Sequence, residues 1–148
     1  LFISESGYGF LCKNKELLSS NRNGKSIVKN KQSNIIMPLE VDAKNFDYYL
    51  LVTNNQYLIL SKLDDIPILT KGKGVKLINI PKAEDSEKVI FSGVIRAGQR
   101  LEISAENKRS KYIEFKELQP YIMTRTRRGK KIEQKFIHKN MELNYNIG

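Results

Sequence analysis

The sequence of 148 residues has one cysteine, one histidine, no tryptophan and only four prolines. A single cysteine cannot form an internal disulfide, and one histidine without a cysteine pattern does not make a zinc site. No apolar run approaches the ~18–20 residues of a membrane span, and no signal-peptide pattern opens the chain. We therefore exclude disulfide-stapled, zinc-dependent and membrane-spanning classes, and we expect no membrane partner.

The sequence has an excess of positive charge. It contains 26 Lys and Arg and 16 Asp and Glu, which gives a net charge of +10. The excess is uneven, because residues 96–148 hold thirteen basic and six acidic side chains while residues 47–95 hold six of each. A hydrophobic content of 40% excludes a disordered tail. Clustered cations favour a polyanionic partner. The plainer alternative at this point is a basic domain without such a partner.

The chain repeats with a period near 50 residues. Residues 3–10 resemble residues 52–59, since each stretch has an apolar run, a polar turn and a second apolar run that begins at a tyrosine. A third, weaker copy contains residues 93–101, Leu118 and residues 124–130. Each copy has a glycine in its basic segment, and these glycines, Gly24, Gly74 and Gly129, lie 50 and 55 residues apart. This period is typical of a four-stranded blade. We therefore divide a single domain, residues 1–148, into approximate units 1–46, 47–95 and 96–148.

Short apolar runs predict an all-β fold. Residues 48–53 and 57–60 flank Asn54-Asn55, which predicts a hairpin. Residues with similar composition predict further strands at 75–80, 89–91, 101–104 and 111–116. No long segment has helical periodicity. The sequence thus predicts antiparallel four-stranded blades, about three of them.

Motifs for catalysis are fragmentary. Asn23-Gly24-Lys25-Ser26 ends like a nucleotide-binding P-loop, but Ser19 stands where that loop needs glycine and a strand-like run follows. We interpret it as a turn into a strand. The acidic groups Asp64-Asp65 and Glu84–Glu87 are interpreted as solvated turns. We therefore predict no catalytic, metal or cofactor site in this chain.

Cations gather in three loops that contain glycine. Arginine forks onto phosphate oxygens, and glycine lets a loop approach another surface closely; such contacts do not depend on base sequence. Similar loops in successive repeats favour a surface that follows a phosphate backbone. The candidate contact residues are Arg22, Lys25, Lys71, Lys73, Lys76, Arg125, Arg127, Arg128, Lys130 and Lys131.

Residues 7–12, 21–25 and 71–81, together with the region of Arg127-Arg128-Gly129, closely resemble the C-terminal domain of the A subunit of bacterial topoisomerase IV, a type IIA topoisomerase. The resemblance implies a β-pinwheel, a propeller-like domain of four-stranded blades, with double-stranded DNA along its basic outer rim. The related gyrase A subunit carries a Gln-Arg-Arg-Gly-Gly-Lys-Gly box that this chain lacks. Two alternatives stay open: a gyrase-type DNA-wrapping domain, or a propeller-like protein-interaction module whose basic loops are incidental.

The resemblance also implies how the domain acts. It would bind and bend DNA and orient the segment for ATP-dependent strand passage, in decatenation and supercoil relaxation, without being catalytic itself. The parent's Mg²⁺, ATP and tyrosine nucleophile would lie in other regions. Its partners would be the B subunit together with the rest of the A subunit, in the bacterial cytoplasm at the nucleoid. Because the chain starts at Leu1 without a methionine, we expect a fragment with upstream blades missing, or else a naturally short, open domain.

Overall fold

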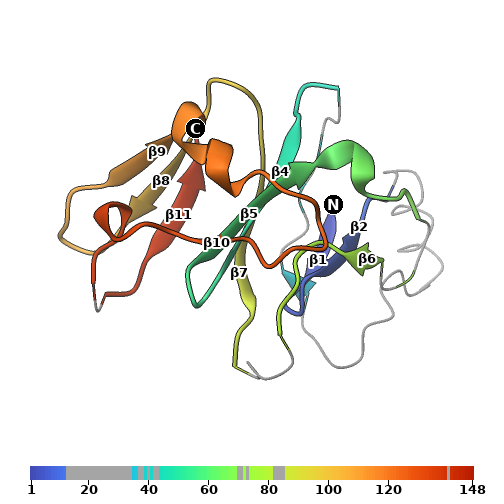
Figure 1. Cartoon of the computed structure of the whole chain (residues 1–148), viewed down its shortest axis with the longest axis horizontal. Helices are drawn as coiled ribbons and strands as arrows, with labels where there is room; N and C mark the ends of the chain where they lie inside the picture. The colour runs from blue at the N-terminus through green and yellow to red at the C-terminus, as the bar shows by residue number, and fades with distance from the viewer. Residues whose placement is uncertain are drawn as a thin grey trace, which may run out of the picture.

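The structure is a computed structural model that describes residues 1–12, 35–36, 39, 41, 44–69, 72, 74–81, 86–139 and 141–148. It contains three antiparallel sheets side by side, and the second lies between the other two (Figure 1). The predicted all-β class is confirmed. Among the described residues, no helix has the length and apolar composition that a bilayer crossing requires.

Each sheet is one blade. The first blade has the order β3-β1-β2-β6, with β1 Phe2–Ser4, β2 Tyr8–Phe10, β3 Ile35–Ile36 and β6 Val75–Lys76. The second has the order β10-β5-β4-β7, with β4 Tyr48–Thr53, β5 Tyr57–Lys62, β7 Val89–Ile95 and β10 Lys130–Lys131. The third has the order β11-β8-β9, with β8 Arg100–Ser104, β9 Lys111–Glu114 and β11 Asn144–Ile147. Short 3₁₀ helices follow β5, β9 and β10, at η1 Leu63–Asp65, η2 Phe115–Tyr121 and η3 Gln134–Phe136.

The first two blades receive their last strand from later in the chain. β6 pairs with β2 through Tyr8 and Lys76, and β10 pairs with β5 through Tyr57 and Lys131. In both cases a glycine with positive φ stands directly before the added strand, Gly74 at +84° and Gly129 at +89°. A side chain at either glycine would collide with a carbonyl oxygen of the strand it approaches. The structure therefore places these two glycines at the same point of consecutive blades, whereas Gly24 lies outside the described residues.

The core has two parts, one on each face of the middle blade. Alternate residues of β4 point to opposite faces, so that Leu50 and Val52 join one cluster while Tyr49 and Leu51 join the other. All four side chains are fully buried. This double burial explains why residues 48–52 form an unbroken apolar run, as is usual for strands covered on both sides.

Two predicted strands are shorter than their sequence patterns. Residues 75–80 form a strand only at Val75–Lys76, because Leu77 and Ile78 turn inward and are buried in the core. Residues 111–116 form a strand only to Glu114, where η2 begins. Glu114 and Glu117 make a reciprocal capping box at this start, which stabilises the helical turn.

Buried tyrosines make the fold sensitive to alkaline pH. The Tyr49 hydroxyl donates to the Leu77 carbonyl oxygen at 2.6 Å, and burial raises its pKa. Burial also raises the pKa of Tyr145, to about 12. Because tyrosines of the unfolded chain ionise near pH 10, the free energy of unfolding should fall as the pH rises from about 10 to 12. Urea denaturation across this range should show a smaller fall in Y145F than in the surface variant Y112F; equal falls would contradict this assignment.

Candidate nucleic-acid interface

The basic loop of residues 123–131, called here the rim loop, crosses from the third blade over the second to the first. The Met123 N–H donates to the Leu60 carbonyl oxygen at 2.9 Å, and the Arg127 carbonyl oxygen accepts from the Asn79 N–H at 2.8 Å. Arg125 Nη1 donates to the Lys76 carbonyl oxygen at 2.9 Å. Arg125 of the rim loop therefore contacts the backbone of β6 at Lys76.

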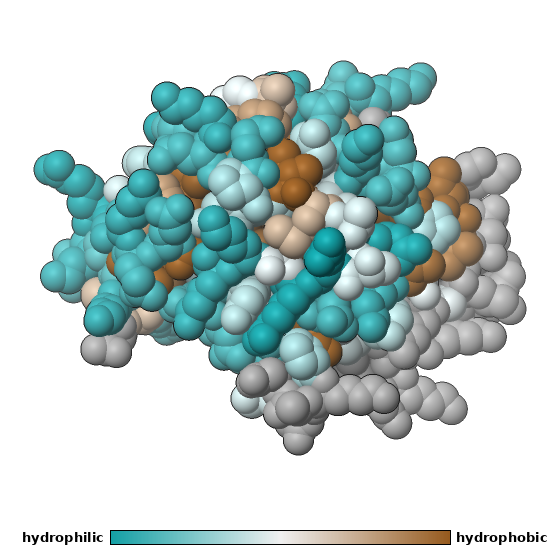
Figure 2. All heavy atoms as spheres, viewed as in Figure 1, coloured by the Kyte–Doolittle hydropathy of each residue, from teal (hydrophilic) through white to brown (hydrophobic). Residues whose placement is uncertain are grey.

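Some cations of the rim loop are exposed to solvent, and others are half-buried and bonded to neighbouring groups. Arg127, Lys130 and Lys131 are exposed, and residues 121–132 contain no carboxylate. Lys76 and Arg125 are half-buried, and Lys76 Nζ donates to Asn79 Oδ1 at 3.3 Å. Hydrophilic side chains cover most of the face that the rim loop crosses (Figure 2). The other four candidates, Arg22, Lys25, Lys71 and Lys73, lie outside the described residues.

Arg128 points inward and forms an ion pair with a buried carboxylate. Its Nη2 lies 3.0 Å from Glu87 Oε2, and its guanidinium lies 3.9 Å from the centroid of the Tyr57 ring. The Glu87 side chain is 0% exposed, and its Oε1 accepts from Thr53 Oγ1 at 2.9 Å. Arg128 thus anchors the rim loop to the second blade, with part of its charge neutralised.

The interpretation of 84–87 as a solvated turn is wrong for Glu87, which is buried, whereas Asp64 and Asp65 are exposed as predicted. The hairpin residue Asn54 holds Glu87 in place: its Nδ2 donates to the Ser86 carbonyl oxygen at 2.8 Å, and its Oδ1 accepts from the Lys88 N–H at 3.0 Å. Nothing in the local sequence distinguishes Glu87 from its acidic neighbours, because its cation comes from 41 residues away.

A polar groove of about 440 Å³ lies beside this ion pair. Its lining contains amide, aromatic and cationic side chains and no carboxylate: Asn54, Asn55, Gln56, Tyr57, Arg128 and Lys131. Lys131 is directly opposite Tyr57 in the pairing of β10 with β5. Hydrogen-bond donors therefore dominate this groove, which we call the turn groove.

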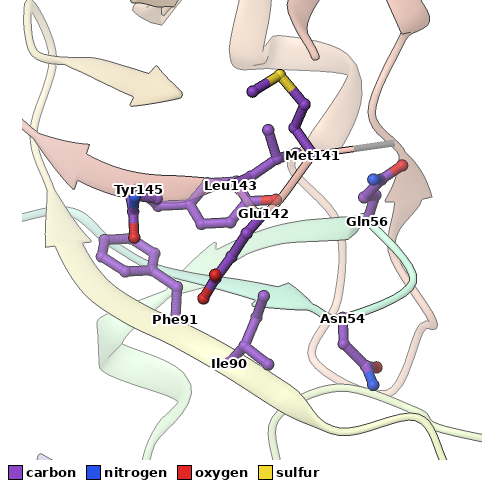
Figure 3. Close-up of a pocket in the computed structure, with 9 residues that line it drawn as sticks. Asn54, Gln56, Ile90, Phe91, Met141, Glu142, Leu143 and Tyr145 are labelled. Atoms are coloured by element: carbon purple, nitrogen blue, oxygen red, sulfur yellow. The ribbon is translucent and has the colours of Figure 1, made fainter. Parts of the chain in front are cut away.

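A larger hollow of about 520 Å³ lies between the second and third blades (Figure 3). The rings of Phe91 and Tyr145 face each other there at 5.7 Å, and Glu142 is the one ionisable carboxylate that lines it. A single carboxylate without a histidine, cysteine or cation beside it is no acid–base pair. Among the described residues, no three His, Cys, Asp or Glu side chains are grouped as a metal site would need.

Three antiparallel sheets, two of them completed by a strand from the next repeat, define a propeller-type domain with a basic loop on its surface. The chain belongs to the family of DNA gyrase C-terminal domains, a β-propeller family whose model matches residues 1–34 and 47–95. The resemblance to topoisomerase subunits noted from the sequence is therefore confirmed.

Relatives and solved structures agree. The A subunit of DNA topoisomerase 4 from Pseudomonas aeruginosa is 34% identical over 142 residues, which are 92% of this chain and 19% of that protein. The corresponding protein of Escherichia coli K12 is 38% identical over 84 residues, 57% of this chain and 11% of that one. The solved C-terminal domain of E. coli ParC is 25% identical and superposes with a TM-score of 0.78. The superposition covers all of this chain and 59% of the ParC domain chain. This chain thus spans about a fifth or less of the curated relatives.

Proposed function

We propose that this chain is a non-catalytic domain of a topoisomerase IV A subunit that binds and bends double-stranded DNA. The observation that carries the proposal is the rim loop, which presents Arg127, Lys130 and Lys131 to solvent without a carboxylate in residues 121–132. Cations placed in this way neutralise phosphates and release counterions, which gives affinity without sequence preference.

Contacts between the loops extend this surface. The hydrogen bond from Arg125 to the Lys76 carbonyl oxygen joins the rim loop to β6 of the first blade, so one duplex could touch both. We propose Arg22, Lys25, Lys71 and Lys73 as further contacts, on the strength of their similar place in the repeats. Lys76 and Arg125 add positive potential while they hold the loops together, and Arg128 supports the loop through Glu87.

We propose the role in the whole enzyme by analogy with the family. By bending DNA at its rim, the domain would orient the segment that the enzyme passes through another duplex. Its partners would be the B subunit together with the rest of the A subunit. Cleavage and ATP hydrolysis, with the Mg²⁺ they require, would take place in other parts of the enzyme. Its place would be the bacterial cytoplasm, at the nucleoid.

Duplex binding by this chain should weaken steeply with salt. If about 4–6 phosphates are neutralised, the slope of log K against log salt should be roughly −4 to −5, with little difference between sequences. Fluorescence anisotropy with two unrelated 30-bp duplexes at several salt concentrations measures it, and the same mixtures with Mg²⁺ and ATP should leave the DNA uncut. Absent or salt-insensitive binding would contradict the proposal and favour a protein-interaction module. Strong chiral wrapping of long DNA would favour a gyrase-type domain.

A further inference from the structure

Gln56 has a backbone conformation that favours glycine. Its φ is +66°, and its N–H donates to the Thr53 carbonyl oxygen at 2.9 Å to close the hairpin turn. An L-residue in the left-handed region is strained, and glutamine has no special tolerance for it. Observed strain of this kind is a reason to look for a function.

The first blade has glycine at the same point. Gly7, with φ +91°, closes its turn onto the Ser4 carbonyl oxygen at 3.0 Å. The carbonyl oxygens of the two residues also correspond. The Gly7 oxygen accepts from the Leu77 N–H and the Gln56 oxygen accepts from the Ile132 N–H, and the donors Leu77 and Ile132 lie 55 residues apart. A Cβ at Gly7 would lie 2.7 Å from the Ile78 side chain, so glycine is required there. The second blade has room for a side chain and carries one despite the strain.

No internal hydrogen bond accounts for the glutamine. Gln56 is half-buried, and no hydrogen bond among the described residues uses its carboxamide. The side chain instead lines both the turn groove and the hollow between the blades, where Figure 3 shows it on the opposite side from the ring pair of Phe91 and Tyr145.

The chemistry of the turn groove points to an anion. The carboxamides of Asn55 and Gln56 offer N–H donors, Lys131 offers an exposed ammonium, and Arg128 also lines the groove. Asn54 contributes less, because its own amide is bonded to residues 86 and 88. Phosphodiester oxygens accept hydrogen bonds and carry the negative charge that such a donor set lacks.

We infer that the turn groove is a phosphodiester-binding subsite for the duplex, in which Gln56 and Lys131 contact one phosphate of the DNA backbone. The inference rests on the proposed function. It adds to the DNA-binding surface a neutral, strained residue that an analysis of charge alone would not find. It also places the duplex beside β5 and β10 of the second blade.

The test is Gln56→Gly, which removes the side chain and suits the backbone. We expect the melting temperature to stay the same or rise, while the Kd for a 30-bp duplex rises about 3- to 10-fold, the loss of one hydrogen bond of ordinary net strength. Asn107→Gly is the matched control, because Asn107 also has positive φ, +60°, in an exposed turn of the third blade. It should leave the Kd unchanged.

A second variant tests the subsite even if Gln56→Gly fails to fold. Gln56→Glu keeps the shape and the strain but replaces the donor with a negative charge, so it should weaken binding more than Gln56→Gly does. Wild-type Kd values in both Gln56 variants would overturn the subsite and leave the proposed function standing. If the wild-type chain itself binds no duplex, the proposed function fails, and the subsite fails with it.

Discussion

Replacing Arg128 with alanine should lower the free energy of unfolding by about 2–4 kcal/mol. The substitution leaves the carboxylate of Glu87, whose side chain is 0% exposed, without its cation. It also removes the guanidinium from the face of the Tyr57 ring. Breaking a fully buried pair costs about 3–5 kcal/mol, and we expect less here because the Arg128 side chain is 31% exposed. Urea denaturation followed by far-UV circular dichroism measures the change.

The control is a second cation of the same loop. Lys130→Ala removes an exposed side chain and should change the stability by less than about 1 kcal/mol. In the double variant Glu87→Gln/Arg128→Ala, the neutral amide can still accept from Thr53 Oγ1, so part of the lost stability should return. If Arg128→Ala proves as stable as Lys130→Ala, the ion pair does not hold the rim loop.

The double variant Arg127→Ala/Lys130→Ala should weaken duplex binding about tenfold or more, equally for unrelated sequences. Both side chains are exposed, and neither takes part in an ion pair among the described residues, so the fold should be unaffected. Each lost phosphate contact removes about 0.9 from the salt slope, and the slope should therefore become shallower by up to about 1.8. Anisotropy titrations over a salt series give both quantities.

A variant with the same change in charge separates this path from general attraction. Lys108 and Arg109 are also exposed, but they lie in a turn of the third blade next to Glu106. Lys108→Ala/Arg109→Ala should therefore reduce affinity less than the rim-loop pair. The reverse order, at equal stability, would place the DNA on a different face of the molecule.

Apolar patterning predicts the middle blade well, because β4 and β5 are long enough for their composition to stand out. The same patterning does not predict the two added strands. β6 and β10 have two residues each, too few to show a hydrophobic period, and their partner strands come from an earlier repeat. Only the spacing of Gly74 and Gly129 marks their positions.

The candidate site divides in a similar way. Charge and glycine spacing predict the basic loop around Arg127, but they do not predict the hydrogen bond that joins Arg125 to the Lys76 carbonyl oxygen. They did not distinguish Arg128 from Arg127, although one is anchored and the other exposed. That difference depends on Tyr57 and Glu87, which the fold brings together from distant positions. Local sequence holds no signal for such an encounter.

The way the blades share strands has a mechanical consequence. β10 is an edge strand of the second blade, yet the chain reaches it from η2, which packs against both β5 and β9, and leaves it for η3, which packs against β9 of the third blade (Figure 1). A force on the rim loop would therefore act on the backbone of the third repeat and on the edge hydrogen bonds of the second blade together. Tension at one blade is thus transmitted through the covalent chain to its neighbour, and the two blades would resist unfolding together.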